Sequence, residues 1–546
     1  FGYLPIRRGD VWLSHLSGSW ANEGVLTQEP LTPGMKVIKN KDGVRNSHTD
    51  HAEVMFSLDG RPQENTGNVI GAALCYSGNY KLRIETHDDE YHHFFAGINE
   101  ENSTYSLKKD ELFRTPELAL TYSNEGLSNF HRWARLHKLA RGTTPRKILL
   151  NSWEGVYFDI NQQGMDQMMA DIASMGGELF VMDDGWFGDK YPRKNDSSSL
   201  GDWVVDKNKL PNGIEGLLSD AKKHGVKFGI WIEPEMISED SDLYREHPDW
   251  ALMIPGRNPV RSRNQLVLDF SRKEVVDGIF GQISAVLDNA NIEYVKWDMN
   301  RSLMDVFSVM TKDQGRVMYD YVLGLYDFLD RMVNRYPDLL IEGCSGGGGR
   351  FDAGMLYYTP QIWCSDNSDA IDRLRIQYGT SFGYPVSTMG AHVSAVPNHQ
   401  TGRVTDMKTR GVVAMSGTFG YELDLLKLTE EEKDEVRSQI GEFRKYAPLI
   451  QNGRYYRLTD PFKSEVCAWE IVGNSQEEVL LNVVMEEIHG NMTVNYVQLR
   501  GLDESALYKE QTTGRIYSGA ALMHGGMPLP AEFGEYRAYQ YHFVRE

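Results

Sequence analysis

The chain has 546 residues, with 57 Lys and Arg against 77 Asp and Glu and a formal net charge of -20. Its hydrophobic fraction of 41% and charged fraction of 25% are those of ordinary globular proteins, which excludes intrinsic disorder, collagen and coiled coil. No apolar run reaches the ~18 residues of a membrane span, and an acidic chain without a basic stripe is a poor ligand for nucleic acid. At roughly 100 to 200 residues per domain, the length predicts two to four domains.

The cysteines give a weak indication of the cellular compartment. Cys75, Cys344, Cys364 and Cys467 are too few and too scattered for a disulfide framework or a zinc ribbon. They favour a reducing interior, and we expect a cytoplasmic protein. The chain begins at Phe1 rather than at Met, which fits either a removed signal peptide or an internal fragment.

The hydrophobic pattern changes at residue 146. Before it, short runs alternate polar and apolar positions and are broken by Gly, Asn and Asp, which predicts a β-sandwich. After it, short apolar runs alternate with stretches of helical period, as in βα units around a parallel sheet. The expected strands are 147–153, 178–184, 227–233, 294–298, 339–343, 361–366, 386–390 and 412–415. Eight such strands predict a closed (β/α)8 TIM barrel.

The remaining elements complete a three-part fold. Met165, Met168, Met169, Ile172 and Met175 form one apolar stripe, which we interpret as the core face of a helix rather than as a binding face. A last helix is expected at 430–446, followed by strands that include 479–485, 493–499 and 536–543. We therefore expect a multidomain α/β protein with part of a β-sandwich at 1–145, the barrel at 146–450 and an all-β domain at 451–546.

Polar and aromatic residues gather where the expected barrel strands end, which is where barrel enzymes carry their reactive groups. The first strand ends in Trp153, and later ones run into 183–186 (DDGW), 231–235 (WIEPE), 296–300 (KWDMN), 344–350 (CSGGGGR) and 363–367 (WCSDN). Carboxylates accept hydrogen bonds from sugar hydroxyls, and a pyranose packs its C–H face on an indole. Two carboxylates are also the minimum for cleaving a glycosidic bond. The pattern predicts a glycosidase.

Asp298 is the candidate nucleophile. Lys296, two positions earlier on the same strand, points to the same side and should keep the carboxylate ionised. The alternative is an ordinary Lys-Asp ion pair, which is common and often contributes little. At the end of a barrel strand we favour the catalytic interpretation.

Asp366 is the candidate acid. Trp363 and Cys364 offer apolar burial and Asp369 offers like-charge repulsion, and both effects raise the pKa of a carboxyl group. The alternative is that Asp366 or Asp369 only caps the following helix.

Asp183 and Asp184 are adjacent, so on a regular strand their side chains point to opposite faces. If the strand end is irregular, both enter the pocket and bind sugar hydroxyls. A Ca²⁺ or Mg²⁺ site would need further oxygen ligands at regular spacing, and these are missing. The glycine run 346–349 lacks the Lys-Ser/Thr ending of a phosphate loop, so we interpret it as backbone brought close to substrate. No metal and no cofactor are expected.

Five segments carry a resemblance to a known family. They are 178–187 (ELFVMDDGWF), 229–236 (GIWIEPEM), 294–301 (YVKWDMNR), 344–352 (CSGGGGRFD) and 363–373 (WCSDNSDAIDR). Long, ordered and specific, they resemble glycoside hydrolase family 36, the bacterial and fungal-type α-galactosidases of clan D. The resemblance covers essentially the whole chain. It implies a retaining mechanism on the barrel and a longer N-terminal sandwich, so that the one seen here is expected to be incomplete.

The resemblance also assigns roles to residues of this chain. It implies that Asp298 is the nucleophile and that Asp366, rather than Asp369, is the acid/base, with ~5 to 5.5 Å between the two carboxyl groups. It implies that Asp183 and Asp184, with Lys296, bind the 4- and 6-hydroxyls of galactose. The other implied substrate-binding residues are Trp153, Trp231, Arg263, Asn300, Cys344, Gly346 and Trp363.

The implied activity is hydrolysis of terminal α-linked galactose from raffinose- or melibiose-type oligosaccharides. Two alternatives on the same fold stay open: an α-N-acetylgalactosaminidase, and a raffinose- or stachyose-synthase-like enzyme that transfers galactose. A non-catalytic carbohydrate-binding protein is disfavoured because both catalytic carboxylates are present. The expected partner is an α-galactoside, with no nucleic acid and no membrane, and the resemblance implies a homo-oligomer, a tetramer or a dimer.

Overall fold

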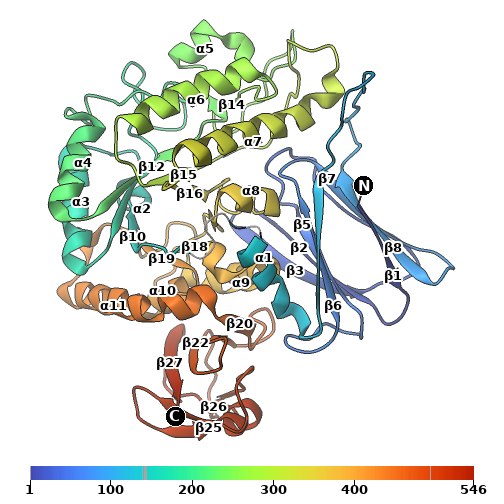
Figure 1. Ribbon diagram of the computed structural model, residues 1–546. Helices are drawn as coiled ribbons and strands as arrows, with labels where there is room; N and C mark the ends of the chain where they lie inside the picture. Colours follow the sequence, from blue (N-terminus) through green and yellow to red (C-terminus); the bar gives the residue numbers. More distant parts are fainter. Residues whose placement is uncertain (1, 138, 140–143, 492) are drawn as a thin grey trace.

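The computed structural model describes residues 2–137, 139, 144–491 and 493–546. Two antiparallel sheets at the N-terminal end pack beside a central barrel, and a small antiparallel domain lies below the barrel at the C-terminal end (Figure 1). The expected fold class, a barrel between two β regions, is confirmed. No helix in the described part of the chain combines the length and apolar character needed to cross a bilayer.

The N-terminal region consists of two antiparallel sheets packed face to face. The four-stranded sheet has the order β1 (Gly2–Arg7), β8 (Tyr91–Ile98), β7 (Tyr80–Thr86) and β4 (Gly34–Lys39). The five-stranded sheet has the order β3 (Asn22–Pro30), β2 (Trp12–Ser19), β5 (Asp50–Ser57), β6 (Val69–Cys75) and β9 (Glu117–Ser123). Phe56 and Phe94 meet edge-on between the sheets, with ring centroids 5.2 Å apart. The alternating pattern thus buries one face of each sheet.

Eight parallel strands close the barrel, because β10 pairs with β11 on one side and with β19 on the other. In barrel order they are β10 (Leu149–Asn151), β11 (Leu179–Met182), β12 (Lys227–Ile232), β15 (Tyr294–Trp297), β16 (Leu340–Gly343), β17 (Gln361–Trp363), β18 (Met389–Ser394) and β19 (Thr418–Glu422). A separate two-stranded ribbon, β13 (Met236–Ile237) and β14 (Leu266–Val267), extends the loop after β12. The barrel strands are short and buried, as their apolar runs predict.

Helix α1 (Phe130–His137) precedes the first barrel strand, and the later helices surround the barrel (Figure 1). The later helices are α2 (Trp153–Val156), α3 (Gln162–Met175), α4 (Gly213–His224), α5 (Asp242–Glu246), α6 (Lys273–Asp288), α7 (Val317–Arg335), α8 (Ala353–Tyr358), α9 (Ala370–Gly383), α10 (Met407–Ala414) and α11 (Glu430–Asn452). Short 3-10 turns lie at Gly126–Asn129, Pro248–Trp250, Gln314–Arg316, Val386–Thr388 and Leu425–Lys427, and a π-turn lies at Ala521–Gly525. The methionine stripe of α3 is buried, as expected for a core face.

The last two barrel strands differ from the sequence expectation. The run 386–390 begins as a 3-10 turn, and β18 starts only at Met389. The run 412–415 is not a strand, because it lies at the end of α10, whose first turn is capped by the Asp406 side chain accepting from the Thr409 N–H. The strand itself is β19, which begins at Thr418. The sequence of a short apolar run does not distinguish a buried strand from a buried helix, and the missed signal was Asp406, the capping residue directly before the helix.

The C-terminal domain is a six-stranded antiparallel sheet with its own hydrophobic core. Its order is β20 (Arg454–Arg457), β21 (Val466–Val472), β22 (Glu478–Met485), β27 (Arg537–Arg545), β24 (Leu507–Glu510) and β25 (Ile516–Ser518), with a ribbon of β23 (Tyr496–Val497) and β26 (Met527–Pro528). Helix α11 lies between this domain and the barrel (Figure 1). The domain therefore touches the barrel from outside its wall of helices.

The N-terminal sheets share a continuous core with the barrel, and one face of the C-terminal sheet, including Trp469 and Ile471, joins the same core. At one point two backbones meet, because a Cβ added to Gly379 in α9 would lie 1.5 Å from the carbonyl oxygen of Gly24 in β3. Only glycine permits this approach. Across the same boundary the Ser77 hydroxyl donates to Asp352 at 2.8 Å, and the backbone N–H of Ser47 donates to the carbonyl of Gly349 at 3.0 Å. The sheet is fixed on the side of the barrel that carries the polar strand ends.

Candidate active site

A pocket of about 490 Å³ opens at the carboxyl ends of the barrel strands. Every residue that the sequence analysis placed in the site lines it: Trp153, Asp183, Asp184, Trp231, Arg263, Lys296, Asp298, Asn300, Cys344, Gly346, Trp363 and Asp366. The floor is acidic and the walls carry indole rings. Such a lining suits a neutral ligand with many hydroxyls.

Asp298 is the first residue after β15, and its carboxylate accepts four N–H donors. Oδ1 accepts from the backbone N–H groups of Met299 at 2.8 Å and Gly346 at 3.2 Å. Oδ2 accepts from the Asn300 amide at 2.7 Å and the Trp231 indole at 3.2 Å. Donors of this kind favour the ionised form and fix the direction of both oxygens.

The positive charges around Asp298, like its N–H donors, favour the ionised form of its carboxyl group. Burial alone would raise its pKa, but the cations of Lys296 and Arg263, the Asn300 amide and the Cys344 thiol outweigh burial, so the pKa lies below its usual value. Lys296 makes its ion pair with Asp183 rather than with Asp298, at 2.9 Å. Lys296 therefore stabilises the Asp298 charge without direct contact. The alternative of an ordinary Lys296–Asp298 ion pair is not what the structure shows.

Asp183 and Asp184 both line the pocket because β11 ends at Met182, one residue before them. Asp183 Oδ2 accepts from the Asn151 amide at 2.8 Å as well as from Lys296. Asp184 is held by a bidentate pair with the buried Arg193, at 3.0 and 2.8 Å. The irregular strand end, not a regular pleat, brings the two neighbours together.

Asp366 lies three residues after β17 and is partly open to solvent. Among the described residues, one side chain donates to its carboxyl group, the Trp20 indole at 2.9 Å from Oδ2. Burial and the negative charge of Asp298 raise its pKa above the usual value. The pKa values of Asp298 and Asp366 are thus shifted in opposite directions, as an ionised nucleophile and a proton donor require.

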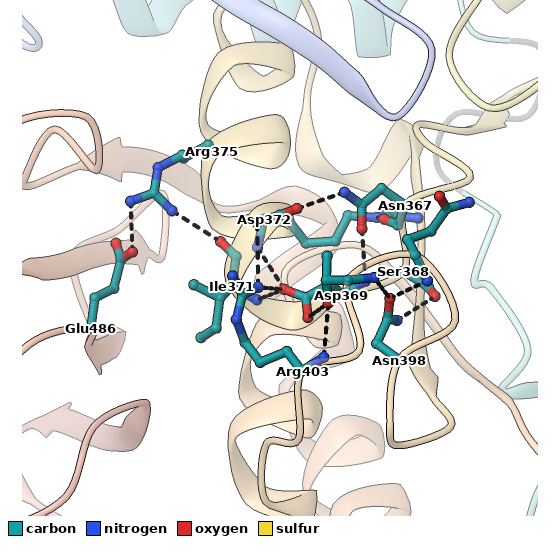
Figure 2. Close-up of polar contacts among 12 residues, drawn as sticks. Asn367, Ser368, Asp369, Ile371, Asp372, Arg375, Asn398, Arg403 and Glu486 are labelled. Atoms are coloured by element: carbon teal, nitrogen blue, oxygen red, sulfur yellow. Dashed lines mark hydrogen bonds and ion pairs between the residues drawn. The ribbon is translucent and has the colours of Figure 1, made fainter.

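The sequence analysis expected the negative charge of Asp369 to raise the pKa of Asp366. The pKa is raised, but by other groups. Asp369 is absent from the pocket lining and caps α9, accepting from the backbone N–H groups of Ile371 and Asp372 at 2.9 and 3.0 Å (Figure 2). It also pairs with Arg403 (Figure 2). Its charge is therefore neutralised locally, and the like charges that act on Asp366 are Asp298 and, to a smaller extent, Glu23.

The glycine run joins neighbouring parts of the site. Gly346 lines the pocket, and a Cβ there would lie 2.9 Å from an Arg45 guanidinium nitrogen. A Cβ on Gly347 would lie 2.6 Å from the Asp366 backbone nitrogen, and one on Gly348 would lie 2.5 Å from the Cys364 carbonyl. The run thus lets the loop after β16 pack directly on the segment that carries Asp366.

Glu233 and Glu235, which follow β12, support the site from behind. Glu233 accepts from the Asn300 N–H at 2.6 Å and the Gln265 amide at 2.8 Å. Burial and the Asp298 charge raise the pKa of Glu233 to about 7. Glu235 binds the Trp297 indole at 3.0 Å and Arg350 at 2.9 Å. Both carboxylates hold strand ends in place rather than lining the pocket.

Sequence reasoning missed part of the lining: Trp20, Arg45, Glu154, Tyr157, Ser262, His399, Gln400 and Glu422. Glu422 ends the barrel strand that was expected too early, so the strand-end rule would have found it. Glu154 follows Trp153 directly and pairs with His399 at 3.2 Å. Trp20 and Arg45 come from the N-terminal sheet, and no local pattern marks them.

Possible metal ligands lie elsewhere. In the described ranges, one trio of side chains is close enough for a common ion, namely Glu465, Glu487 and His489, all exposed in the C-terminal domain. Exposed acidic clusters of this kind are common without an ion. The pocket itself is built for hydrogen bonding to hydroxyls.

Comparison with known proteins identifies the family. The melibiase family model matches residues 112–453, the model of the glycosyl hydrolase family 36 N-terminal domain matches 2–108, and that of the C-terminal domain matches 466–543. The chain belongs to glycoside hydrolase family 36. Within this family it is 51% identical to a bifunctional α-galactosidase/sucrose kinase, AgaSK, of Mediterraneibacter gnavus, over 99% of this chain and 57% of that protein. It is 45% identical to the α-galactosidase Mel36A of Lactobacillus acidophilus, over 97% of this chain and 72% of that protein.

Solved structures of the same family have this fold. The α-galactosidase AgaA of Geobacillus stearothermophilus superposes with a TM-score of 0.96 at 42% identity, covering 100% of this chain and 76% of that one. Variants of AgaA are known in complex with raffinose and with stachyose. The chain thus spans between about half and three quarters of the family 36 relatives that it matches.

Proposed function

We propose that this chain is a retaining exo-α-galactosidase that hydrolyses terminal α-linked galactose from raffinose-type oligosaccharides and melibiose. The observation that carries the proposal is the contrast between Asp298 and Asp366. Asp298 has a lowered pKa because of the Lys296 and Arg263 charges and its hydrogen-bond donors, whereas Asp366, in the same pocket, has a raised pKa because of burial and the Asp298 charge. Retaining glycosidases need this division between a nucleophile and a proton donor.

The proposed reaction has two steps. In the first, an Asp298 oxygen attacks the anomeric carbon, and Asp366 gives its proton to the glycosidic oxygen as the bond to the leaving group breaks. This leaves a galactosyl ester on Asp298. In the second step Asp366, now ionised, takes a proton from water, the water attacks the anomeric carbon, and the ester bond breaks. Two inversions give galactose of the original α configuration.

The deepest part of the pocket supports recognition of a single terminal sugar. Two buried ion pairs lie there, Lys296 with Asp183 and Arg193 with Asp184, so that the Lys296 ammonium can donate to a hydroxyl while the two carboxylates accept. A carboxylate has about four lone-pair sites, so Asp184 can accept from hydroxyls while it holds Arg193. We assign Lys296 and the two carboxylates to the 4- and 6-hydroxyls of galactose, with Trp153, Trp231 and Trp363 as walls.

The choice of oligosaccharide rests on relatives. The complexes of AgaA with raffinose and stachyose make galactose oligosaccharides of this type the first substrates to test. The remaining wall of the pocket, Cys344 and Gly346 backed by Arg45, leaves little room near the nucleophile. This favours a hydroxyl over an acetamido group on carbon 2, although the acetamido sugar and transfer to a sugar acceptor remain outcomes of the same test.

The test is proton NMR of 4-nitrophenyl α-galactoside hydrolysis, following the anomer released in the first minutes. We expect the wild type to release α-galactose from this substrate. With raffinose as the substrate, we expect Asp298→Asn and Asp366→Asn to release no galactose. Release of β-galactose would overturn the retaining mechanism. Cleavage of 4-nitrophenyl α-N-acetylgalactosaminide but not of the galactoside would replace the substrate, and galactosyl oligosaccharides as the main product would indicate a transferase.

Three further points stay predictions. We propose a cytoplasmic location, supported by the small number of cysteines and their scatter along the sequence. We propose a homo-oligomer, a tetramer or a dimer, which sedimentation velocity would measure. We also propose that 1–145, 146–450 and 451–546 act as domains, with the first inseparable from the barrel because the two share a core.

A further inference from the structure

The hairpin between β2 and β3 reaches from the N-terminal sheet into the active-site pocket. Its two-residue loop is Trp20-Ala21, and Ala21 has the positive φ of 61° that tight hairpins need. Trp20 lines the pocket while 53% of its side chain remains exposed. A large aromatic residue that is half exposed at a loop tip suggests a contact that the sheet itself does not need.

Three consecutive residues of the segment after β17 are bonded to this hairpin. The Ser365 hydroxyl donates to Glu23, and the Asn367 amide donates to the carbonyl of Ala21 at 3.2 Å. Between them, Asp366 accepts from the Trp20 indole at 2.9 Å. The hairpin is itself fixed by the close contact of Gly24 with α9, the helix that follows Asp366. The indole is therefore held in a defined position relative to Asp366.

The indole N–H of Trp20 can only donate a hydrogen bond. It therefore influences which oxygen of Asp366 carries the acidic proton. When Asp366 is protonated, its carbonyl oxygen is the stronger acceptor, so the hydrogen bond from Trp20 favours Oδ2 as the carbonyl oxygen. The acidic proton is then on Oδ1. Without the indole, either oxygen could carry it, and only one of them can face the glycosidic oxygen.

We infer that Trp20 is a positioning residue of the proton donor, which keeps the proton of Asp366 on Oδ1, and that its exposed ring packs against the first sugar of the leaving group. This inference rests on the proposed function. The second part follows from geometry, because the leaving oxygen must lie within hydrogen-bond distance of Asp366. The sugar attached to that oxygen must then lie beside the residue bonded to the same carboxyl group.

The charge of Asp366 responds to several groups besides Trp20. The charged and titratable groups that act on it are Glu23 and Arg45 of the N-terminal sheet and Lys296, Asp298, Cys344 and His399 of the barrel. The Trp20 hydrogen bond lowers its pKa against the effect of burial. Removal of this N–H therefore raises the pKa of Asp366. Since the acid works while protonated, the alkaline limb of the pH profile moves to higher pH.

The experiment compares the wild type with Trp20→Phe, which keeps a ring but loses the N–H, and with Trp20→Ala. The control is Trp12→Phe, because the Trp12 indole donates to Asp10 at 3.0 Å in the same sheet but lies outside the pocket. Each variant is assayed for kcat/KM against pH with melibiose, raffinose and 4-nitrophenyl α-galactoside. Thermal unfolding of each variant reports on the fold.

For Trp20→Phe we expect kcat/KM to fall about tenfold or more on melibiose and raffinose, and by no more than about threefold on the nitrophenyl galactoside, whose leaving group needs little protonation. The alkaline limb should move up by about half to one pH unit. Trp20→Ala should also raise KM for raffinose, and Trp12→Phe should change none of these values.

Equal losses on all three substrates, or an unmoved alkaline limb, would overturn the positioning role. An unchanged raffinose KM in Trp20→Ala would overturn the contact with the leaving sugar. A wild type that cleaves no α-galactoside would instead refute the proposed function, and the inference would fall with it.

Discussion

The segments after β15 and after β17 each place a carboxylate in the pocket, yet they hold it in different ways. Asp298 accepts four N–H donors, all of them from the barrel. Within the described part of the chain Asp366 accepts one, which comes from a hairpin of the N-terminal sheet. The first arrangement stabilises a charge, and the second leaves a group free to gain and lose a proton. The same residue type is thus given two functions by the number and origin of its donors.

An indole N–H lies on each carboxylate, Trp231 on Asp298 and Trp20 on Asp366. Each carboxylate thus accepts one indole N–H, but the charged groups around the two carboxylates differ. Lys296 and Arg263 lower the pKa of Asp298, whereas Asp298 itself raises that of Asp366. The difference teaches that the ionised nucleophile helps to keep its partner protonated. The following predictions test this asymmetry, starting from the largest effect.

Asp298→Asn should abolish turnover of every α-galactoside. The amide cannot form the ester intermediate, so kcat should fall by about 10⁴-fold or more on aryl and sugar leaving groups alike. Assays with 4-nitrophenyl α-galactoside and melibiose measure this. Residual activity within tenfold of the wild type would show that another group is the nucleophile.

Asp366→Ala should be selective for the leaving group. Loss of the acid should lower kcat/KM on melibiose by about 10²- to 10⁴-fold and much less on the nitrophenyl galactoside in the first step. Azide, which needs no base, should restore turnover and give α-galactosyl azide, detectable by NMR. A uniform loss on both substrates without azide rescue would contradict the acid/base role.

Trp231→Phe should move the acidic limb of the pH profile. Asp298 must be ionised to act, so activity is lost as the pH falls through its lowered pKa. Removal of one N–H donor raises that pKa, and the limb should shift to higher pH by about half to one unit while the alkaline limb stays. A pH series of kcat/KM on the nitrophenyl galactoside measures both limbs. Movement of the alkaline limb alone would contradict the assignment.

Asp369→Ala should have the smallest effect on activity. The carboxylate caps α9 and pairs with Arg403 (Figure 2), and neither residue lines the pocket. We expect a stability loss of about 1 to 2 kcal/mol for the cap, seen as a lower unfolding temperature, with kcat/KM changed by no more than about threefold. As a neighbour of Asp366 it is a matched control. A loss as large as that of Asp366→Ala would mean that the two carboxylates were assigned wrongly.

Much of the fold could be predicted because its elements are locally encoded. The methionine stripe defined α3, and the strand ends 183–186 and 296–300 fell where the barrel places them. Prediction failed at 412–415, where an apolar run belongs to a helix capped by Asp406. Burial on all sides removes the periodicity that separates a helix from a strand, and at such runs the sequence is ambiguous.

By itself the sequence determined which residues gather at the strand ends, because a parallel barrel brings all carboxyl ends to one side. Only the tertiary structure decided how they are partnered. Trp20 and Asp366 are 346 positions apart in the chain, and the hydrogen bond between them depends on two glycine backbones in contact. Lys296 likewise pairs with Asp183 rather than with its near neighbour Asp298. Such contacts cross between elements, and no local pattern of residue types records them, since their geometry is set by packing.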